Sequence, residues 1–311
     1  MFDYLLSLLT VLAIAPASFS GVTPMQVYGQ SVAVEPLLIQ KEGIVSQAVA
    51  TPRKIDPNNL GLVVSGQSVF VADVASGGVL FAKAPHDVRS IASLSKLMTS
   101  IVVLESDQGL EGNLSFVRSD FDYRSSTEFR INETIDKRDA LKAMLVGSVN
   151  EVAVAFARSS GMSEDEFILR MNQKAKELHL VSLSFADPTG LNVENKGSAA
   201  DVAALITIAM NYPEIREALN LSEINLTTKE GKEYNVESTN LLLQSFLNED
   251  PYKIMAAKTG SLPEAGYCLA QVTRNSAGHE VVVVMLGGDN HFTRFKDVKA
   301  LTSWVFDSYI W

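Results

Sequence analysis

Runs of residues typical of β-strands lie at two distant places in the sequence, and this separation constrains the fold more than any other feature. Three runs follow one another towards the C-terminus and are rich in Val, Tyr and Thr or nearly continuously apolar: Ile254–Thr259, Tyr267–Thr273 and Glu280–Gly287. Two earlier runs, Ser68–Val74 and Gly78–Ala82, are separated by a short turn and predict a hairpin. Since the residues between these groups show helical patterns, we expect both ends to pair in one sheet, in an α/β or α+β fold.

The predicted helices carry apolar residues at helical spacing and are bounded by Gly, Asp, Asn or Pro. In the first of them, Leu94, Leu97 and Ile101 fall on one face, so this helix should be buried. The helices expected are Ser93–Glu105, Asp139–Val146, Glu151–Ser159, Glu164–Leu178, Ala199–Met210 and Phe295–Ile310.

Composition and charge exclude several classes of protein. Hydrophobic residues make up 47% of the 311 residues and charged residues 20%, which is ordinary globular usage and unlike disordered, collagen-like or coiled-coil chains. Acidic residues outnumber basic ones by 36 to 26, and a net charge of -10 disfavours nucleic acid as a partner. The single cysteine, Cys268, cannot form an intramolecular disulfide. The four histidines have no spacing that places two metal ligands on one helix face, so no metal site is expected.

The N-terminal stretch Tyr4–Ala17 is almost purely apolar and has the length of a signal-peptide core rather than of a membrane-spanning helix. Ala15 and Ala17 are typical of a cleavage site, whereas the lack of Lys or Arg before the apolar run departs from the usual signal. Residues 1–20 are therefore interpreted as a signal peptide or an N-terminal anchor, with a buried core helix as the alternative. The proline-containing residues 21–59 predict a linker before a folded domain at 60–311. Export to the periplasm or extracytoplasmic cell envelope follows, with membrane contact only through an uncleaved N-terminal segment.

One pair of residues points to nucleophilic chemistry. Ser93 is the only serine that is followed three residues later by a lysine, Lys96. Residues three apart share one face of a helix, so the Lys96 ammonium can reach the Ser93 hydroxyl. A serine needs a base to become a nucleophile, and a lysine can act as that base if burial or a nearby cation lowers its pKa. Alone, the pair is weak evidence, because the same spacing arises by chance on exposed helices.

Two further motifs carry polar groups that could join this pair. An S-V-N sequence at 148–150 lies between two predicted helices, where its side chains can pass a proton or exchange hydrogen bonds. Ser and Asn also commonly cap helices, and S-T-N at 238–240 has the same spacing, so both interpretations stay open here. The only K-T-G sequence, at 258–260, lies on the first late strand, and a fixed cation beside a hydroxyl suits a carboxylate. Its glycine allows a ligand to approach the backbone closely.

The three motifs together, S-x-x-K at Ser93, S-x-N at Ser148 and K-T-G at Lys258, resemble the signature set of penicillin-binding proteins and class A β-lactamases. Longer stretches agree, namely IASLSKLMT, LVGSVNEVAVAFA, FADPTGL and KTGSLPEAGYCLA. The sequence is identified as a member of the low-molecular-mass D-alanyl-D-alanine carboxypeptidase and endopeptidase family, over about residues 68–306. The resemblance implies a β-lactamase/transpeptidase-like fold: an antiparallel sheet flanked by helices, with a helical subdomain. It also implies a serine peptidase that acts on the stem peptides of peptidoglycan.

The resemblance further implies a role for each motif residue. Ser93 would be the acyl-enzyme nucleophile, Lys96 its general base and Ser148 a proton relay. The backbone N–H groups of Ser93 and Ser261 would form the oxyanion hole. No cofactor would be required, and β-lactam antibiotics, which resemble the substrate, would acylate the serine. The implied substrate-binding residues are Asn150, Lys258, Thr259, Gly260 and Ser261.

Two alternatives to a peptidase stay open. A class A β-lactamase would need a glutamate for deacylation, yet no E-x-x-L-N segment lies between Ser148 and Lys258, and Val149 stands where those enzymes have Asp. A non-catalytic cell-wall-binding homologue would have little reason to keep every motif residue. The sequence ends at Trp311, directly after the last predicted helix, and so looks more like the short endopeptidase branch than the two-domain carboxypeptidases.

Three other features are interpreted as structural. Asp187–Leu191 has the composition of a tight turn. Cys268 lies in an apolar strand and is expected to be a buried small hydrophobe. The acidic residues 164–166 suit the first turn of a helix. Arg294 is not placed by the sequence.

Overall fold

The computed structural model of the chain describes residues 49–121 and 129–311. The predicted leader at residues 1–20 and most of the predicted linker at 21–59 lie outside the described residues. Among the helices of the described part, none is both long and apolar enough to cross a bilayer.

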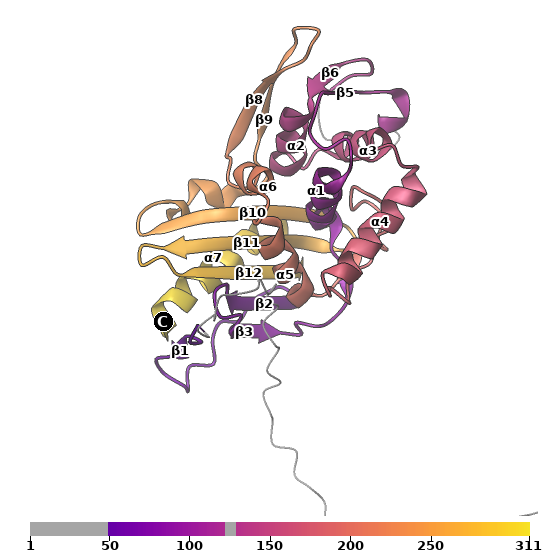
Figure 1. Ribbon diagram of the computed structural model, residues 1–311. Coiled ribbons are helices and arrows are strands. Elements are labelled where there is room, and N and C mark those ends of the chain that lie inside the picture. Colours follow the sequence, from indigo (N-terminus) through magenta and orange to yellow (C-terminus); the bar gives the residue numbers. More distant parts are fainter. Residues whose placement is uncertain (1–48, 122–128) are drawn as a thin grey trace, which may run out of the picture. The chain divides into compact units, whose positions relative to one another are not determined.

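A five-stranded antiparallel sheet forms the centre of the fold, in the order β10-β11-β12-β2-β3 (Figure 1). β12 pairs with β2, and Val283 lies opposite Val71. The prediction that the distant strand-like runs pair in one sheet is therefore confirmed. The strands are β10 (Tyr252–Leu262), β11 (Gly266–Asn275), β12 (Glu280–Gly288), β2 (Ser68–Asp73) and β3 (Val79–Lys83).

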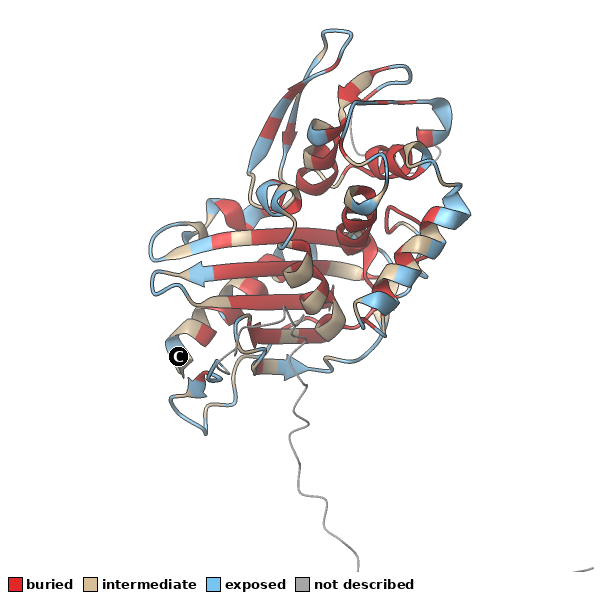
Figure 2. Ribbon diagram, viewed as in Figure 1, coloured by how far each residue is buried: buried red, intermediate tan, exposed pale blue. Residues whose placement is uncertain are grey.

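Helices cover both faces of the sheet, which explains why its central strands are nearly continuously apolar. Successive side chains of a strand point to opposite faces, so the two faces share each strand. On β12, Val283 belongs to the buried cluster that includes α7 (His291–Ser308). Its neighbour Val284 belongs to the cluster that includes α1 (Lys96–Glu105) and α5 (Ala199–Ala209). Figure 2 shows the central parts of these strands as buried.

The expected helical subdomain is present beside the sheet. Side chains cap the starts of two of its helices, because the Asp136 carboxylate accepts the N–H of Arg138 and Ser163 forms a capping box with Glu166. The acidic residues 164–166 therefore occupy the first turn of a helix, as predicted. The subdomain contains α2 (Lys137–Val146), α3 (Asn150–Ser159), α4 (Glu164–Glu177) and the strand pair of β5 (Asn113–Ser115) with β6 (Thr134–Asp136).

The ends of the folded chain differ from prediction. β1 (Arg53–Lys54) pairs with β13 (Tyr309–Ile310), so the fold begins before residue 60, inside the predicted linker. The last helix accordingly ends at Ser308 instead of Ile310. A paired strand of two residues carries no periodic pattern, and its partner lies at the other end of the sequence. The start of the domain was therefore not visible in the sequence.

The chain between α5 and β10 contains a hairpin that was not predicted. β8 (Glu223–Thr227) pairs with β9 (Glu233–Glu237), and only alternate residues of β8, Ile224 and Leu226, are buried. Two buried positions in a polar stretch are a weak strand signal. The remaining short elements are β4 (Arg89–Ser90), β7 (Lys196–Gly197), α6 (Pro213–Ala218), and the 3-10 turns η1 (Ala92–Ser95), η2 (Arg118–Phe121), η3 (Leu241–Gln244) and η4 (Phe246–Asn248).

Candidate active site

The structure brings Ser93 and Lys96 together at the start of α1. Ser93 lies in the 3-10 turn η1, and Lys96 is the first residue of the α-helix that follows. Lys96 Nζ lies 3.1 Å from Ser93 Oγ. The amine also donates to Asn150 Oδ1 at 2.7 Å and to the Thr189 carbonyl at 2.6 Å. Three oxygens therefore orient one nitrogen, and the Ser93 hydroxyl is one of them.

Burial changes the protonation of Lys96. Its side chain is 0% exposed, and loss of solvation lowers the pKa of Lys96 to about 7, against the opposing charges of Asp187 and Glu151. About half of the molecules then carry a neutral Lys96 amine at pH 7. A neutral amine can take a proton from the serine hydroxyl, which an ammonium cannot.

Ser148 and Asn150 reach the site from the loop before α3. Ser148 has a left-handed backbone, with a φ of 60°, and its hydroxyl accepts a hydrogen bond of 2.8 Å from Lys258 Nζ. The N-cap of α3 is Val149, which makes no side-chain capping bond. The capping alternative for Ser148 is therefore wrong. The second S-x-N sequence behaves differently, because Asn240 caps η3 by accepting the N–H of Leu242.

The K-T-G residues lie on β10 beside these groups. Lys258 is buried, and burial lowers its pKa well below the usual value, helped by the charges of Lys96 and Arg294. Thr259 Oγ1 lies 2.6 Å from Thr239 Oγ1, so the strand hydroxyl is held by a residue just after the β8–β9 hairpin. The site thus places the Lys258 amine and hydroxyls on one wall, where they can donate hydrogen bonds to a carboxylate.

Two glycines allow the backbone to pack closely around the nucleophile. A Cβ on Gly260 would lie 3.1 Å from the Ser93 backbone nitrogen. Gly190 has a φ of +87°, and a Cβ there would lie 2.0 Å from the Ala92 carbonyl oxygen. Ala92 itself has a φ of 48°, an uncommon conformation for a non-glycine residue. Ala92, the residue before Ser93, is therefore enclosed on two sides, by the turn that contains Gly190 and by β10 at Gly260, and they hold it in this strained conformation.

The turn at Asp187–Leu191 is structural, as expected, and it also serves the site. The Asp187 carboxylate accepts the N–H groups of Thr189 and Gly190 at 2.5 and 2.6 Å. This arrangement presents the Thr189 carbonyl to Lys96. This contact could not be predicted, because a backbone carbonyl has no signature in the sequence.

Arg294 on α7 is a second residue whose position could not be predicted. It is 3% exposed, and its Nη1 donates to the Gly260 carbonyl at 3.0 Å and the Cys268 carbonyl at 3.3 Å. Cys268 is buried as predicted, and burial raises the pKa of its thiol to about 11. The guanidinium thus joins β10 and β11 one residue before Ser261.

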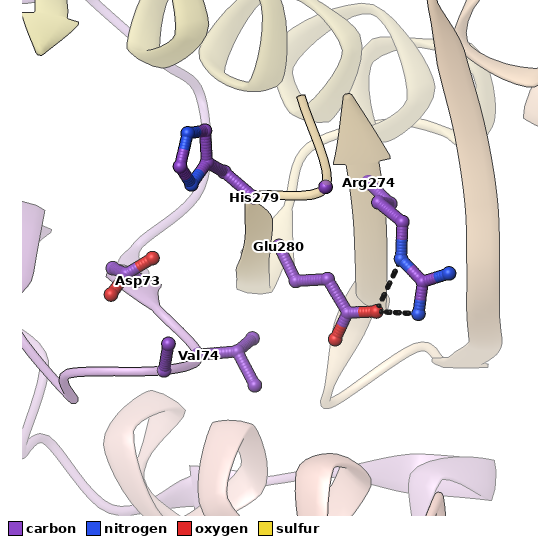
Figure 3. A pocket seen from close by; sticks show the side chains of 7 residues that line it. Asp73, Val74, Arg274, His279 and Glu280 are labelled. Atoms are coloured by element: carbon purple, nitrogen blue, oxygen red, sulfur yellow. Dashed lines mark hydrogen bonds and ion pairs between the residues drawn. The ribbon is translucent and has the colours of Figure 1, made fainter. Parts of the chain in front are cut away.

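One hollow of the described chain lies away from these residues and lacks their chemistry. This hollow of about 480 Å³ lies at the far ends of β11 and β12 and includes Asp73, Arg274 and Glu280 among its lining residues (Figure 3). Arg274 and Glu280 form an ion pair there, with 2.5 Å between Arg274 Nη2 and Glu280 Oε1. The residues that line this hollow include no serine–lysine pair. Within the described residues, no cluster of three or more His, Cys, Asp or Glu side chains could hold a metal ion.

A serine hydroxyl against a buried lysine of lowered pKa, beside an antiparallel sheet flanked by helices, is the arrangement of an active-site-serine enzyme that transfers acyl groups. A family model described as D-alanyl-D-alanine carboxypeptidase matches residues 55–290, and the chain belongs to this family, peptidase S11.

Comparisons with individual proteins agree with this family. The chain is 30% identical to the D-alanyl-D-alanine endopeptidase of Escherichia coli K12 over 83% of both chains. The Streptomyces K15 DD-transpeptidase has a similar fold, with a TM-score of 0.73 at 24% identity over 79% of this chain and 99% of that one. Penicillin-binding protein D2 of Listeria monocytogenes, solved in a cefotaxime-bound form, aligns with a TM-score of 0.67 at 30% identity, over the same shares. The expected fold class is therefore confirmed.

Proposed function

We propose that this chain is a serine-type D-alanyl-D-alanine carboxypeptidase or D-alanyl endopeptidase that acts on peptidoglycan stem peptides. The contact of 3.1 Å between Lys96 Nζ and Ser93 Oγ, made by a buried lysine whose pKa is lowered to about 7, carries the proposal. Family membership and the 30% identity to an endopeptidase that the chain covers over 83% of its length support it. The same resemblance favours cleavage of peptide cross-links over removal of a terminal D-Ala.

The first half of the reaction acylates the enzyme. Neutral Lys96 takes the hydroxyl proton while Ser93 Oγ forms a bond to the carbonyl carbon of the D-Ala residue. The carbonyl oxygen becomes an oxyanion, which the N–H groups of Ser93 and Ser261 stabilise, at about 3 kcal/mol for each donor. The C–N bond then breaks, and the leaving amine takes the proton that Lys96 holds, with Ser148 as the relay.

The second half releases the acyl group. Water attacks the ester carbonyl, its proton passes to neutral Lys96, and the C–O bond to Ser93 breaks with return of that proton to Oγ. Asn150 orients Lys96 and the substrate amide, whereas Lys258, Thr259 and Gly260 bind the terminal carboxylate and the adjacent backbone. No cofactor enters either half.

Penicillin tests this proposal directly, because β-lactams present the same reactive carbonyl. Intact-mass spectrometry after brief exposure should show a stable adduct on the peptide that contains Ser93, and Ser93→Ala should lose it while staying folded. Rapid drug hydrolysis without an adduct would favour a class A-like β-lactamase. No reaction at all would favour a non-catalytic cell-wall-binding homologue. Purified muropeptides, cross-linked or monomeric, then separate the endopeptidase from the carboxypeptidase.

We also propose that the chain works outside the cytoplasm, in the periplasm or at the cell envelope. Peptidoglycan lies there, and the apolar residues 4–17 have the length of a signal-peptide core. In this proposal residues 1–20 are a leader or anchor and the catalytic domain runs to Trp311. The catalytic domain then starts before the predicted residue 60 and includes Arg53, which pairs with Ile310. The mass of the mature protein from an expressing cell would show whether the leader is cleaved.

A further inference from the structure

His291 contacts Arg294, the buried arginine that donates to the K-T-G strand β10. His291 is the first residue of α7, and its Nδ1 lies 3.2 Å from Nη2 of Arg294. The imidazole meets the rings of Tyr267, Phe292 and Phe295 edge-on, with centroids 5.9, 5.0 and 5.4 Å away. Tyr267 and Phe295 also face the guanidinium, whose carbon lies 5.4 and 4.6 Å from their ring centres. The histidine, the arginine and two of the rings therefore form one compact group.

The chemistry of the contact fixes the protonation of the imidazole. A guanidinium carries only N–H donors, so Nδ1 of His291 must be the acceptor and cannot carry a proton while the contact exists. A neutral ring with its proton on Nε2 meets this condition. A doubly protonated ring would point a donor and a positive charge at Arg294, and the contact would be lost.

The other side of Arg294 reaches the peptide between Gly260 and Ser261. Arg294 Nη1 donates to the Gly260 carbonyl. In a trans peptide the C=O and the following N–H point in opposite directions, so a donor that holds the Gly260 C=O also sets the direction of the Ser261 N–H. Gly260 lies against the Ser93 backbone, since a Cβ there would be 3.1 Å from its nitrogen. A shift of Arg294 would therefore move this peptide relative to the nucleophile.

We propose that His291 is a positioning residue: through Arg294 it holds the Gly260–Ser261 peptide in the orientation that acyl transfer at Ser93 requires. This inference rests on the proposed function of the site. It assigns to an exposed side chain, outside the three motifs, a neutral form that favours acylation and a protonated form that does not.

The surroundings of His291 favour the neutral ring. Partial burial and then the charge of Arg294 lower the pKa of His291 below its usual value. The start of a helix also disfavours a cation. From β11 the ring faces the Tyr267 phenol, and before the helix stands Asp289, whose carboxylate accepts from Asn290. Because the residue itself is exposed, its protonation follows the pH of the solution.

The test compares acylation by a fluorescent penicillin in His291→Ala, His291→Gln and wild type between pH 5 and 8. At pH 8 His291→Ala should react about three- to tenfold more slowly, which corresponds to one lost hydrogen bond. His291→Gln offers Arg294 an acceptor that does not titrate, so it should stay within about twofold of wild type. Lys296→Ala, an exposed change on the same helix, is the control and should match wild type.

The decisive readout is the ratio of rates, because the titration of Lys96 is common to all variants and cancels. As pH falls, the wild-type rate should approach that of His291→Ala, whereas His291→Gln should keep its advantage. A deficit of His291→Ala that stays constant to pH 5 would reduce His291 to a merely structural role and overturn the proposal. Equal rates of His291→Ala and wild type at pH 8 would also overturn it.

A measurement without turnover separates this inference from the proposed function. NMR of the imidazole nitrogens should show Nδ1 unprotonated in wild type, and Arg294→Met, which removes both the charge and the donor, should raise the pKa of His291. A wild-type protein that no penicillin labels would defeat the proposed function and, with it, the acylation role of His291. A protonated Nδ1 at pH 8 would defeat the inference alone, whether or not penicillin reacts.

Discussion

The protonation of Lys96 should control acylation, and its environment allows the effect to be calculated. The neutral amine is the active form, so the rate must rise with pH and level off above the pKa, which lies at about 7. For one titrating group, the rate at pH 6 should be about one tenth of the plateau and at pH 5 about one hundredth. With a lysine of ordinary pKa as the base, the acylation rate would instead keep rising with pH through the whole physiological range and reach no plateau there.

A single substitution should move this curve in a known direction. The charges of Asp187 and Glu151 raise the pKa of Lys96 against the effect of burial. Glu151→Gln removes one of these charges with little change in shape, so the midpoint should fall below 7. A fall of about half a unit would make acylation at pH 6 about threefold faster, while the plateau at pH 8 stays the same.

The assay is the second-order rate constant for labelling by a fluorescent penicillin, measured from pH 5 to 9. Asp165→Asn, an exposed acid in the first turn of α4, is the matched control and should leave the midpoint unchanged. A rate that does not vary between pH 5 and 8 would refute the role of Lys96 as the base. A midpoint that moves upward in Glu151→Gln would refute the electrostatic reasoning alone.

Three further predictions concern the backbone at Gly190, the helix cap at Ser163 and the buried amine of Lys96. Gly190→Ala should lower the free energy of unfolding by at least about 2 kcal/mol and slow acylation, because the new Cβ would meet the Ala92 carbonyl. The control is Gly231→Ala, which has a similar φ of +86° but open space around it, and thermal unfolding should show a loss of only about 1 kcal/mol. Ser163→Ala should cost about 1 kcal/mol in denaturant unfolding through the lost capping box, with unchanged acylation. The unfolded chain binds a proton at Lys96 up to a pKa of 10.5 and the folded chain only up to about 7. Lys96 should therefore contribute a rise of about 2 kcal/mol in the free energy of unfolding between pH 7 and 9, and Lys96→Met should remove this contribution.

The sequence allowed much of the sheet and the three motifs to be predicted, for physical reasons. β12 is buried on both faces, so it had to be apolar along its length, and such a run is visible without a structure. A serine and its lysine must share one helix face, which restricts them to a fixed spacing. These constraints act between neighbours in the sequence, and a single sequence displays them.

The parts of the site that could not be predicted depend on contacts between distant residues. Thr189 serves Lys96 with a backbone carbonyl, and any residue has one. Thr239 meets Thr259 only because the β8–β9 hairpin, itself weakly patterned, brings it there. Arg294 lies in a helix whose register against β10 follows from the packing of the whole domain. In each case the chemistry resides in the position and not in the residue type.

Four departures from local rules lie around the nucleophile, and their coincidence there supports its function. Ala92 and Ser148 are two of the five described non-glycine residues with positive φ. Two lysines, Lys96 and Lys258, are buried with their pKa values lowered. Each of these features costs stability, since strained backbone costs about 1–3 kcal/mol and a buried charge must be desolvated. A chain that needed only to fold would gain from replacing them. Their presence around one hydroxyl follows if the strain and the lost solvation keep Lys96 neutral, orient Ser148 and hold the Ser93 backbone where an acyl group can be transferred.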